Sequence, residues 1–232
     1  MTASSPVTEA YLETIYNLAM ENQTVRAVDL ASHFNVSRPT VTQTLRRLSE
    51  AGLVSQARPT GVTLTDRGRS ETEALLRRHR LAERLLFDVL GMDFVAAHEQ
   101  AHALEHWISP EVERKISELL RMPATCPHGN PIPGNGPAGV DYLRDQQGVR
   151  LADVEPGETV VVIAISEVVE DESALLRSLL DTGIVPGHRL VVEPAVDGEV
   201  AYRTASGRRH RLSRSLAVLI WVRSLSPESG QA

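Results

Sequence analysis

Cysteine is nearly absent from this chain of 232 residues, which contains only Cys126. A single cysteine excludes a disulfide framework within the chain and suits a reducing compartment. Long apolar runs are also missing: no stretch approaches the roughly 18 uncharged residues of a membrane-spanning helix. The start, MTASSPVTEAYLETIY, lacks the basic region and apolar run of a signal peptide. We therefore expect a cytoplasmic protein with no membrane partner.

An overall excess of positive charge is missing too. The formal net charge is −6, which argues against a chain that is basic throughout. Residues 26–69 nevertheless carry seven arginines against Asp29, Glu50 and Asp66, a local charge of +4. Residues 141–232 carry ten basic and fourteen acidic side chains, a local charge of −4. The two ends of the chain are therefore expected to face different partners.

Proline and glycine interrupt the segment PATCPHGNPIPGNGPAG, residues 123–139. Such a run can neither continue a helix nor fill a central strand, so we interpret it as part of a linker. Before it, apolar periodicity predicts a hairpin over 53–65 and helices over 11–19, 28–34, 37–52, 66–90, 94–107 and 110–121. After it, the pattern predicts a helix over 172–183 and strands over 158–169, 189–195, 199–204 and 216–222.

These elements predict a fold that is mainly α with a small, barrel-like β domain. The expected division is 1–65, 66–122, a linker over 123–147, and a β domain over 148–226.

The first of these parts has the pattern of a winged helix-turn-helix. Two predicted helices flank the tight turn NVS, and the hairpin forms the wing. In this motif the second helix enters the major groove of DNA. Gln43 suits an adenine edge and Thr40 a thymine methyl. The residues that we expect to contact DNA are Ser37, Arg38, Pro39, Thr40, Thr42, Gln43, Arg46, Arg47 and Arg58, the last three mainly at phosphates. The alternative is an ordinary solvated helix; the wing and the carboxylate-free outer face favour DNA binding.

The second part gathers histidines and carboxylates at helical spacing. His79 and Glu83 are four residues apart and share a helix face. His98, His102, Glu105 and His106 fall within one narrow stripe of the next helix. Neutral imidazole and carboxylate groups suit first-row divalent metals, so we interpret this set as metal ligands.

The same stripe spells H-E-x-x-H over residues 98–102, the pattern of zinc metalloproteases. A protease also needs a third ligand on a following segment and an edge strand beside the helix. Only helices are predicted in this region, so we interpret the string as a consequence of ligand spacing and expect no enzyme.

At this point the chain resembles the diphtheria-toxin-repressor family of metal-dependent transcriptional regulators over nearly its full length. The resemblance rests on EAYLETIY, SRPTVTQTLRRL, RRHRLAERLL, LEHWISPEVER, HGNPIPG and the β-rich tail, which occur in family order. It implies a winged helix, a helical dimerisation domain with two metal sites and a C-terminal SH3-like domain. It also implies a homodimer that binds a palindromic operator, mainly as a repressor.

The resemblance further implies two ligand sets. An ancillary site takes His79, Glu83 and His98, with Glu172 as the best-placed carboxylate of the SH3-like domain; Leu175 stands where the iron branch has a glutamine. A regulatory site takes His102, Glu105 and His106. Ala10 replaces the usual ligand of the first helix, which leaves Glu13, and second Glu9, to substitute for it.

His102 and Ala10 remove both sulfur ligands from the regulatory site, which favours Mn(II). Fe(II) is the alternative, and Zn(II) or Co(II) could bind in vitro. Cys126 lies far from the ligands in sequence and is interpreted as a bystander. Protonation of the histidines is expected to release metal and weaken DNA binding below about pH 6.

Overall fold

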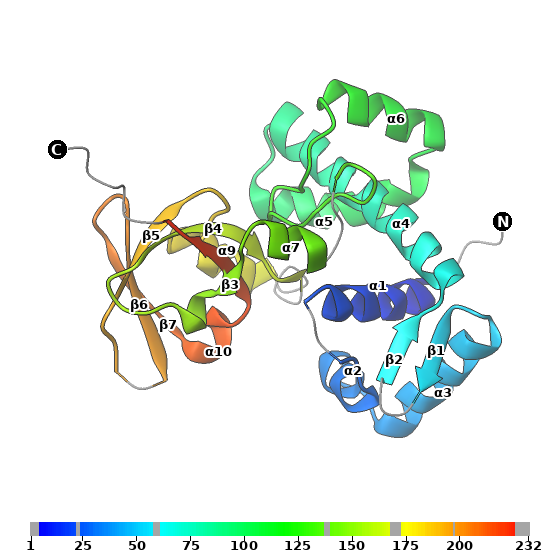
Figure 1. The fold of residues 1–232 in the computed structure, drawn as a ribbon. Coiled ribbons are helices and arrows are strands. Elements are labelled where there is room, and N and C mark those ends of the chain that lie inside the picture. Colours follow the sequence, from blue (N-terminus) through cyan, green and yellow to red (C-terminus); the bar gives the residue numbers. More distant parts are fainter. Residues whose placement is uncertain are drawn as a thin grey trace.

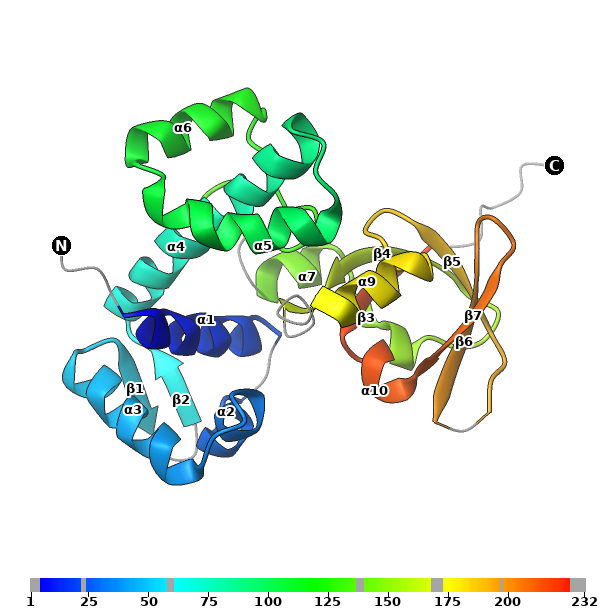
Figure 2. The same ribbon diagram turned by 180° about the vertical axis from the view of Figure 1, so that it is seen from behind.

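The computed structural model describes residues 5–21, 24–57, 61–136, 140–167, 173–196 and 198–225. Figure 1 shows a winged-helix lobe, a helical lobe above it and a β domain to one side. Helix α1 (Pro6–Met20) lies on the side of the winged-helix lobe that faces the helical lobe. Its C-terminal end points towards the β domain, as Figure 2 shows from behind. No helix among the described residues is long and apolar enough to cross a membrane.

The winged helix forms as predicted. Its elements are α1, α2 (Ala27–His33), α3 (Arg38–Glu50), β1 (Val54–Ala57) and β2 (Gly61–Leu64), the two strands pairing antiparallel. Ser37 begins α3 because its Oγ accepts a hydrogen bond from the Thr40 amide at 3.3 Å. After α3, Gly52 adopts a φ of +71°, which favours glycine. Ile15, Leu30, Val41 and Leu45 are fully buried and hold α1, α2 and α3 together.

The helical lobe contains α4 (Asp66–Arg84), α5 (Phe94–Leu104) and α6 (Pro110–Leu119). The helix predicted over 66–90 is regular only as far as Arg84, after which Leu85–Val89 widens into a π-helical turn. The helix predicted over 94–107 also changes before its end, because Glu105–Trp107 tightens into a 3-10 turn. This change rotates Glu105 and His106 away from the positions that a continuous α-helix would give them.

Residues 123–136 are not an exposed tether. Cys126, His128 and Ile132 are almost fully buried, and Thr125 forms a β-bridge with Pro131. The segment also meets the end of β4 (Thr159–Ile165), where the Ile165 amide donates to the His128 carbonyl at 3.0 Å. Gly129 is required here: it has a φ of +91°, and an added Cβ would lie 2.0 Å from the Ile163 carbonyl oxygen. Helix α7 (Val140–Asp145) follows within the segment expected to be a linker.

The β domain is an antiparallel sheet with strand order β3-β8-β4-β5-β6-β7. Its strands are β3 (Val149–Arg150), β4, β5 (Arg189–Glu193), β6 (Glu199–Thr204), β7 (Arg209–Ser213) and β8 (Ile220–Ser224). Helix α9 (Ser173–Asp181) lies against the sheet, and a 3-10 turn, Leu151–Asp153, follows β3. Val160, Ile165, Leu176, Tyr202 and Val222 form the core of the domain.

The strand predicted over 216–222 was wrong in its first part, and strands β3 and β7 were not predicted. The strand predicted over 216–222 begins as helix α10 (Arg214–Ala217), because Ser213 Oγ caps that turn by accepting from the Leu216 amide at 3.3 Å. Strand β7 was not predicted at all. It is an edge strand whose sequence, RHRLS, buries only Leu212, so no alternation of apolar residues marks it.

Candidate metal centre

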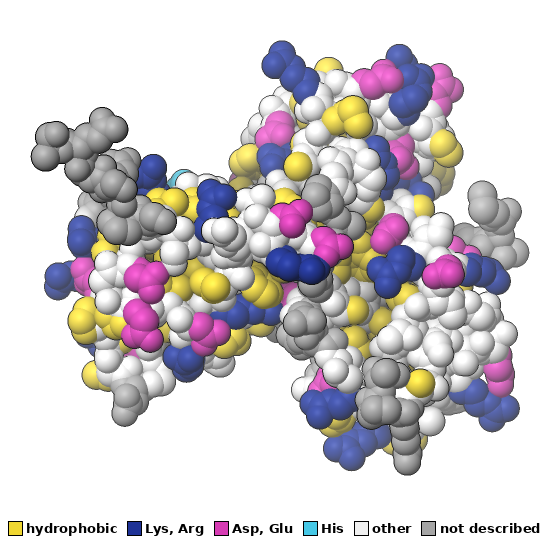
Figure 3. All heavy atoms as spheres, in the orientation of Figure 1, with side chains coloured by type: hydrophobic (Ala, Val, Ile, Leu, Met, Phe, Trp, Pro, Cys, Tyr) yellow, Lys and Arg dark blue, Asp and Glu magenta, His cyan; other side chains and the backbone are white. Residues whose placement is uncertain are grey.

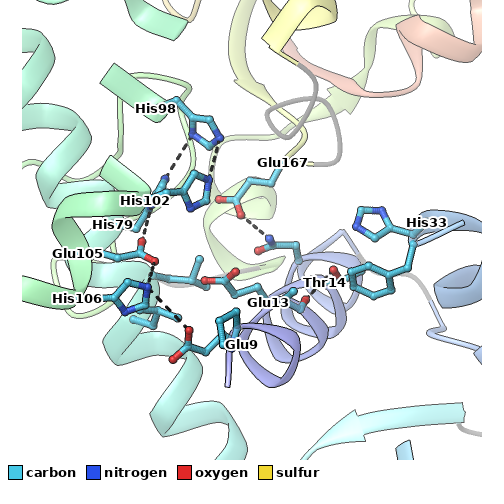
Figure 4. Close-up of a pocket in the computed structure, with 16 residues that line it drawn as sticks. Glu9, Glu13, Thr14, His33, His79, His98, His102, Glu105, His106 and Glu167 are labelled. Carbon is cyan, nitrogen blue, oxygen red and sulfur yellow. Dashed lines mark hydrogen bonds and ion pairs between the residues drawn. The ribbon is translucent and has the colours of Figure 1, made fainter. Parts of the chain in front are cut away.

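A cavity of about 270 Å³ lies between α1, α4, the C-terminal part of α5 with the turn after it, and Glu167, which lies two residues after β4. Figure 4 shows carboxylates and imidazoles from these four segments facing this space. The polar side chains that line it include Glu9, Glu13, Asn17, His79, His98, His102, Glu105, His106 and Glu167. Helix α1 belongs to the winged helix, so the cavity directly joins the DNA-binding lobe to the predicted ligands.

Three histidines meet at one end of this cavity. His98 Nδ1 lies 3.4 Å from His79 Nε2, and His98 Nε2 lies 3.3 Å from His102 Nε2. One nitrogen atom from each of the three rings falls within a sphere small enough for one ion. Loss of solvent and the nearby charge of His79 and His98 lower the pKa of His102 to about 4. His102 is therefore neutral at physiological pH and can donate its lone pair.

His79 is held between two carboxylates. Its Nδ1 lies 2.7 Å from Glu105 Oε2, and its Nε2 lies 3.3 Å from Glu83 Oε1. Burial by itself would lower the pKa of His79, but the charge of Glu83 and the hydrogen bond to Glu105 outweigh it and raise that pKa well above its usual value. This shift favours the protonated ring of His79. A metal that takes its nitrogen must displace a proton.

A second group of donors surrounds Glu83. Its Oε1 lies 2.8 Å from His98 Nδ1 and 3.3 Å from His128 Nδ1, and His128 Nδ1 lies 3.9 Å from Cys126 Sγ. The charge of His128 and His79 holds the pKa of Glu83 well below its usual value, against the opposing effect of burial. The other oxygen, Glu83 Oε2, is buried and accepts no hydrogen bond from any residue that the structure describes. A buried carboxylate oxygen left in this way beside a thiol and an imidazole fits a cation.

Cys126 and His128 were not predicted as ligands. The interpretation of Cys126 as a bystander rested on its distance in sequence, and the structure brings its thiol to Glu83. The available signal was the C-P-H spacing in residues 126–128, which places a thiol and an imidazole two residues apart. The proline and glycine around it suggested an exposed linker and concealed the burial.

Helix α1 supplies carboxylates to the other end of the cavity. His106 Nε2 lies 3.3 Å from Glu105 Oε1 and 3.9 Å from Glu9 Oε2. Burial raises the pKa of Glu9, and Glu105 raises it further, while His106 opposes them. Glu13 and Ala10 line the same space, and Figure 4 places Glu9 and Glu13 together on the α1 side. Either carboxylate can therefore serve where Ala10 has no donor atom.

The two ligand sets expected from the resemblance form one continuous cluster. His79 touches both Glu83 and Glu105, and His102 contacts His98. Glu172, expected to complete the ancillary site, lies outside the described residues. Glu167 is the described carboxylate of the β domain that lines the cavity, and Leu175 packs against the β-domain core.

The residues expected to contact DNA are exposed on α3, as far as the structure describes them. All of those expected on α3, from Ser37 to Arg47, are exposed, while Val41, Leu45 and Leu48 face the core. Ser37 Oγ and Thr40 Oγ1 share a hydrogen bond of 2.8 Å, and Arg46 pairs with Glu50 at 2.8 Å. Arg58 lies outside the described residues. Basic side chains gather at the lower end of this lobe in Figure 3.

The members of the H-E-x-x-H string make separate contacts in the structure. His98 and His102 share the cluster, but Glu99 does not join them, since its Oε1 accepts a hydrogen bond from Ser173 Oγ at 2.7 Å. The carboxylate that would act as the base is therefore occupied at the contact between α5 and α9.

A winged helix joined through a cavity of metal donors to a helical lobe defines a metal-responsive DNA-binding regulator. The sequence matches three known families: the N-terminal DNA-binding domain of iron-dependent repressors over residues 4–62, their metal-binding and dimerisation domain over 65–134, and the FeoA domain over 149–224. The chain belongs to the diphtheria toxin repressor family of metal-dependent transcriptional repressors.

Its relatives include both metal branches. The chain is 40% identical over 198 residues to the iron-dependent repressor IdeR of Mycobacterium leprae, covering 83% of this chain and 86% of that protein. It is 35% identical over 221 residues to the diphtheria toxin repressor of Corynebacterium diphtheriae, covering 94% and 97%. A manganese-dependent transcriptional repressor in complex with manganese superposes with a TM-score of 0.73 at 32% identity, covering 94% of this chain and all of the other. The repressor ScaR with bound Zn²⁺ superposes with a TM-score of 0.79 at 26% identity, covering 95% and 100%.

Proposed function

We propose that this protein is a cytoplasmic, homodimeric repressor that binds a palindromic operator when Mn(II) is bound, with Fe(II) as the alternative metal. The observation that carries the proposal is the cavity in which α1 of the winged helix faces Glu105, His106 and His102. Its α1 side offers the carboxylates of Glu9 and Glu13, and the described residues that line the cavity include no cysteine or methionine. A set of nitrogen and oxygen donors suits Mn(II) better than softer metals.

The proposed regulatory site takes Glu9 or Glu13 from α1 together with His102, Glu105 and His106. The proposed ancillary site takes His79, Glu83 and His98, and its other donors are Cys126, His128 and either Glu167 or Glu172. A bound divalent cation supplies the positive charge that allows Glu9, Glu13 and Glu105 to share one partly buried space. Without such charge these carboxylates repel one another, which opposes this position of α1 against the helical lobe.

In the proposed DNA complex, α3 enters the major groove with Ser37 to Gln43 at the base edges. Arg46, Arg47 and Arg58 contact phosphates on either side. The helical lobe, which matches a dimerisation domain, places two α3 helices about one DNA turn apart. Exposed apolar side chains on this lobe, among them Leu90, Trp107 and Leu119, suit burial against a second copy.

The proposal is tested by titrating the operator with purified protein in the presence of Mn(II), anaerobic Fe(II) or no metal. Operator affinity is expected to rise at least tenfold at micromolar Mn(II), which corresponds to about 1.4 kcal/mol or more. It is expected to rise less with Fe(II). The reverse order would assign the protein to the iron branch. The same affinity in all three conditions would remove the metal from its function.

Gln43→Ala tests the direct reading of bases by α3. The variant is expected to lose about 1–3 kcal/mol of operator affinity, since a bidentate amide contact to adenine has that value. Its affinity for unrelated DNA should stay unchanged. Arg47→Ala is the matched control on the same helix and should weaken both DNAs alike, because a phosphate contact carries no sequence information. Binding is measured by fluorescence anisotropy. If Gln43→Ala lost equal affinity for operator and unrelated DNA, Gln43 would contact the DNA phosphate backbone and not a base.

A further inference from the structure

Polar side chains recur at every fourth position along α1: Glu9, Glu13, Asn17 and Glu21. This spacing keeps them near one side of the helix. The first two face the metal cavity. The last two contact the β domain, and neither is among the expected ligands. The same side of α1 therefore faces two different parts of the molecule.

Glu21, which ends α1, is bound by the β domain at both carboxylate oxygens. Arg150 Nη2 lies 2.9 Å from Glu21 Oε2, and Ser166 Oγ donates to Glu21 Oε1. Only 8% of the Glu21 side chain and 15% of the Arg150 side chain are exposed. The guanidinium of Arg150 stacks 3.6 Å from the centre of the Trp221 ring, which fixes its direction. Truncating one member of so buried a pair leaves the other charge without compensation.

Asn17, one turn earlier, contacts the same domain through Glu167. Asn17 Nδ2 donates to Glu167 Oε2, and Arg80 of α4 donates to Glu167 Oε1. Arg80 is 1% exposed and also donates to the Pro131 carbonyl. Glu167 thus links α1 of the winged helix to α4 of the helical lobe, immediately beside the cavity.

We infer that the β domain positions α1 for metal binding through Arg150, Ser166 and Glu167, although Arg150 and Ser166 are not among the expected ligands. This inference rests on the proposed function. Fixing α1 against the helical lobe costs conformational free energy, which must be supplied before Glu9 and Glu13 face Glu105 and His106. Contacts that hold the C-terminal half of α1 meet part of that cost in advance. Docking of the β domain on α1 therefore raises the affinity for metal, and metal binding favours docking by the same factor.

The test compares full-length Glu21→Gln, Arg150→Gln and the double variant with the unaltered protein. Each single variant is expected to raise the Mn(II) concentration for half-maximal operator binding about tenfold. The double variant should do no worse than either single one, because the two side chains act as a pair. Arg214→Gln is the matched control: it removes an exposed ion pair with Asp153 in the same domain, away from α1, and should leave the midpoint unchanged.

A second readout needs neither metal nor operator. Amide hydrogen exchange along α1 in the metal-free protein should be faster in Glu21→Gln and Arg150→Gln than in Arg214→Gln. Ser166→Ala removes one hydrogen bond to Glu21 without leaving an unpaired buried charge. It replaces the charge variants in this test if they fail to fold. We expect it to shift the Mn(II) midpoint and the α1 exchange rate in the same direction as they do, by a smaller factor.

The outcomes separate the inference from the proposed function. An unchanged α1 exchange rate, or an unchanged Mn(II) midpoint in variants whose melting temperature has fallen, would mean that the contacts only stabilise the fold and would overturn the inference. An unaltered protein whose operator affinity ignores metal would overturn the proposed function. In that case accelerated α1 exchange would still support positioning of α1 by the β domain, and unchanged exchange would reject it.

Discussion

Glu105→Ala is expected to raise the Mn(II) concentration needed for half-maximal operator binding by about 100-fold or more. Removing even an outer partner of a metal ligand costs about 10–100-fold in affinity, and Glu105 is expected to be a ligand itself. Its two oxygens serve different neighbours: Oε2 lies 2.7 Å from His79 and Oε1 lies 3.3 Å from His106. The Glu105 side chain is nearly buried, so no other carboxylate can reach its position from solvent when it is removed. One substitution therefore disturbs both proposed sites.

The measurement is an operator titration at fixed protein concentration over a range of Mn(II), with metal binding followed separately by calorimetry. Glu99→Ala is the control on the same helix, since Glu99 contacts Ser173 and faces away from the cluster. It should leave the Mn(II) midpoint unchanged. A midpoint that moved with Glu99→Ala and not with Glu105→Ala would contradict the assignment and would favour a role for the H-E-x-x-H string.

Lowering the pH from 8 to 6 is expected to raise the Mn(II) midpoint by about tenfold for each pH unit. Coordination requires neutral imidazole, so each metal bound at His79 releases its proton. Although burial opposes it, the carboxylates Glu83 and Glu105 raise the pKa of His79 well above its usual value. That direction favours the protonated ring at neutral pH, so metal must compete with a proton there. His102, with a pKa of about 4, is already neutral and adds nothing to the slope.

The structure thus changes the pH dependence that the sequence suggests. Ordinary histidines would lose metal only below about pH 6, whereas the raised pKa of His79 extends the loss of metal towards neutral pH. The check is a series of Mn(II) binding isotherms from pH 6 to 8, with His79→Gln as the comparison. The variant should bind more weakly but show a flat profile. An unaltered protein with a flat profile between pH 7 and 8 would show that His79 is neutral before metal binds.

Much of the DNA-binding lobe could be predicted from local pattern. Ser37 begins α3 and Gly52 ends it because capping depends on neighbouring atoms only, and the apolar spacing of Val41, Leu45 and Leu48 defines the buried face. The spacing of His79 and Glu83, and of His98 and His102, likewise follows from the pitch of one helix. In the β domain, by contrast, β7 was missed because an edge strand with a single buried side chain carries no local signal.

The sequence by itself determined the types of donor, their places on α4 and α5, the winged helix and the family of the chain, since each depends on spacing within one element or on motif order. Only the tertiary structure decided that Cys126 and His128 reach Glu83, that His79 lies between two carboxylates, and that Glu21 is bound by Arg150. These contacts join residues of different elements. Their existence depends on how α1, α4, the buried segment 123–136 and the β domain pack against one another. Local periodicity carries no information about that packing.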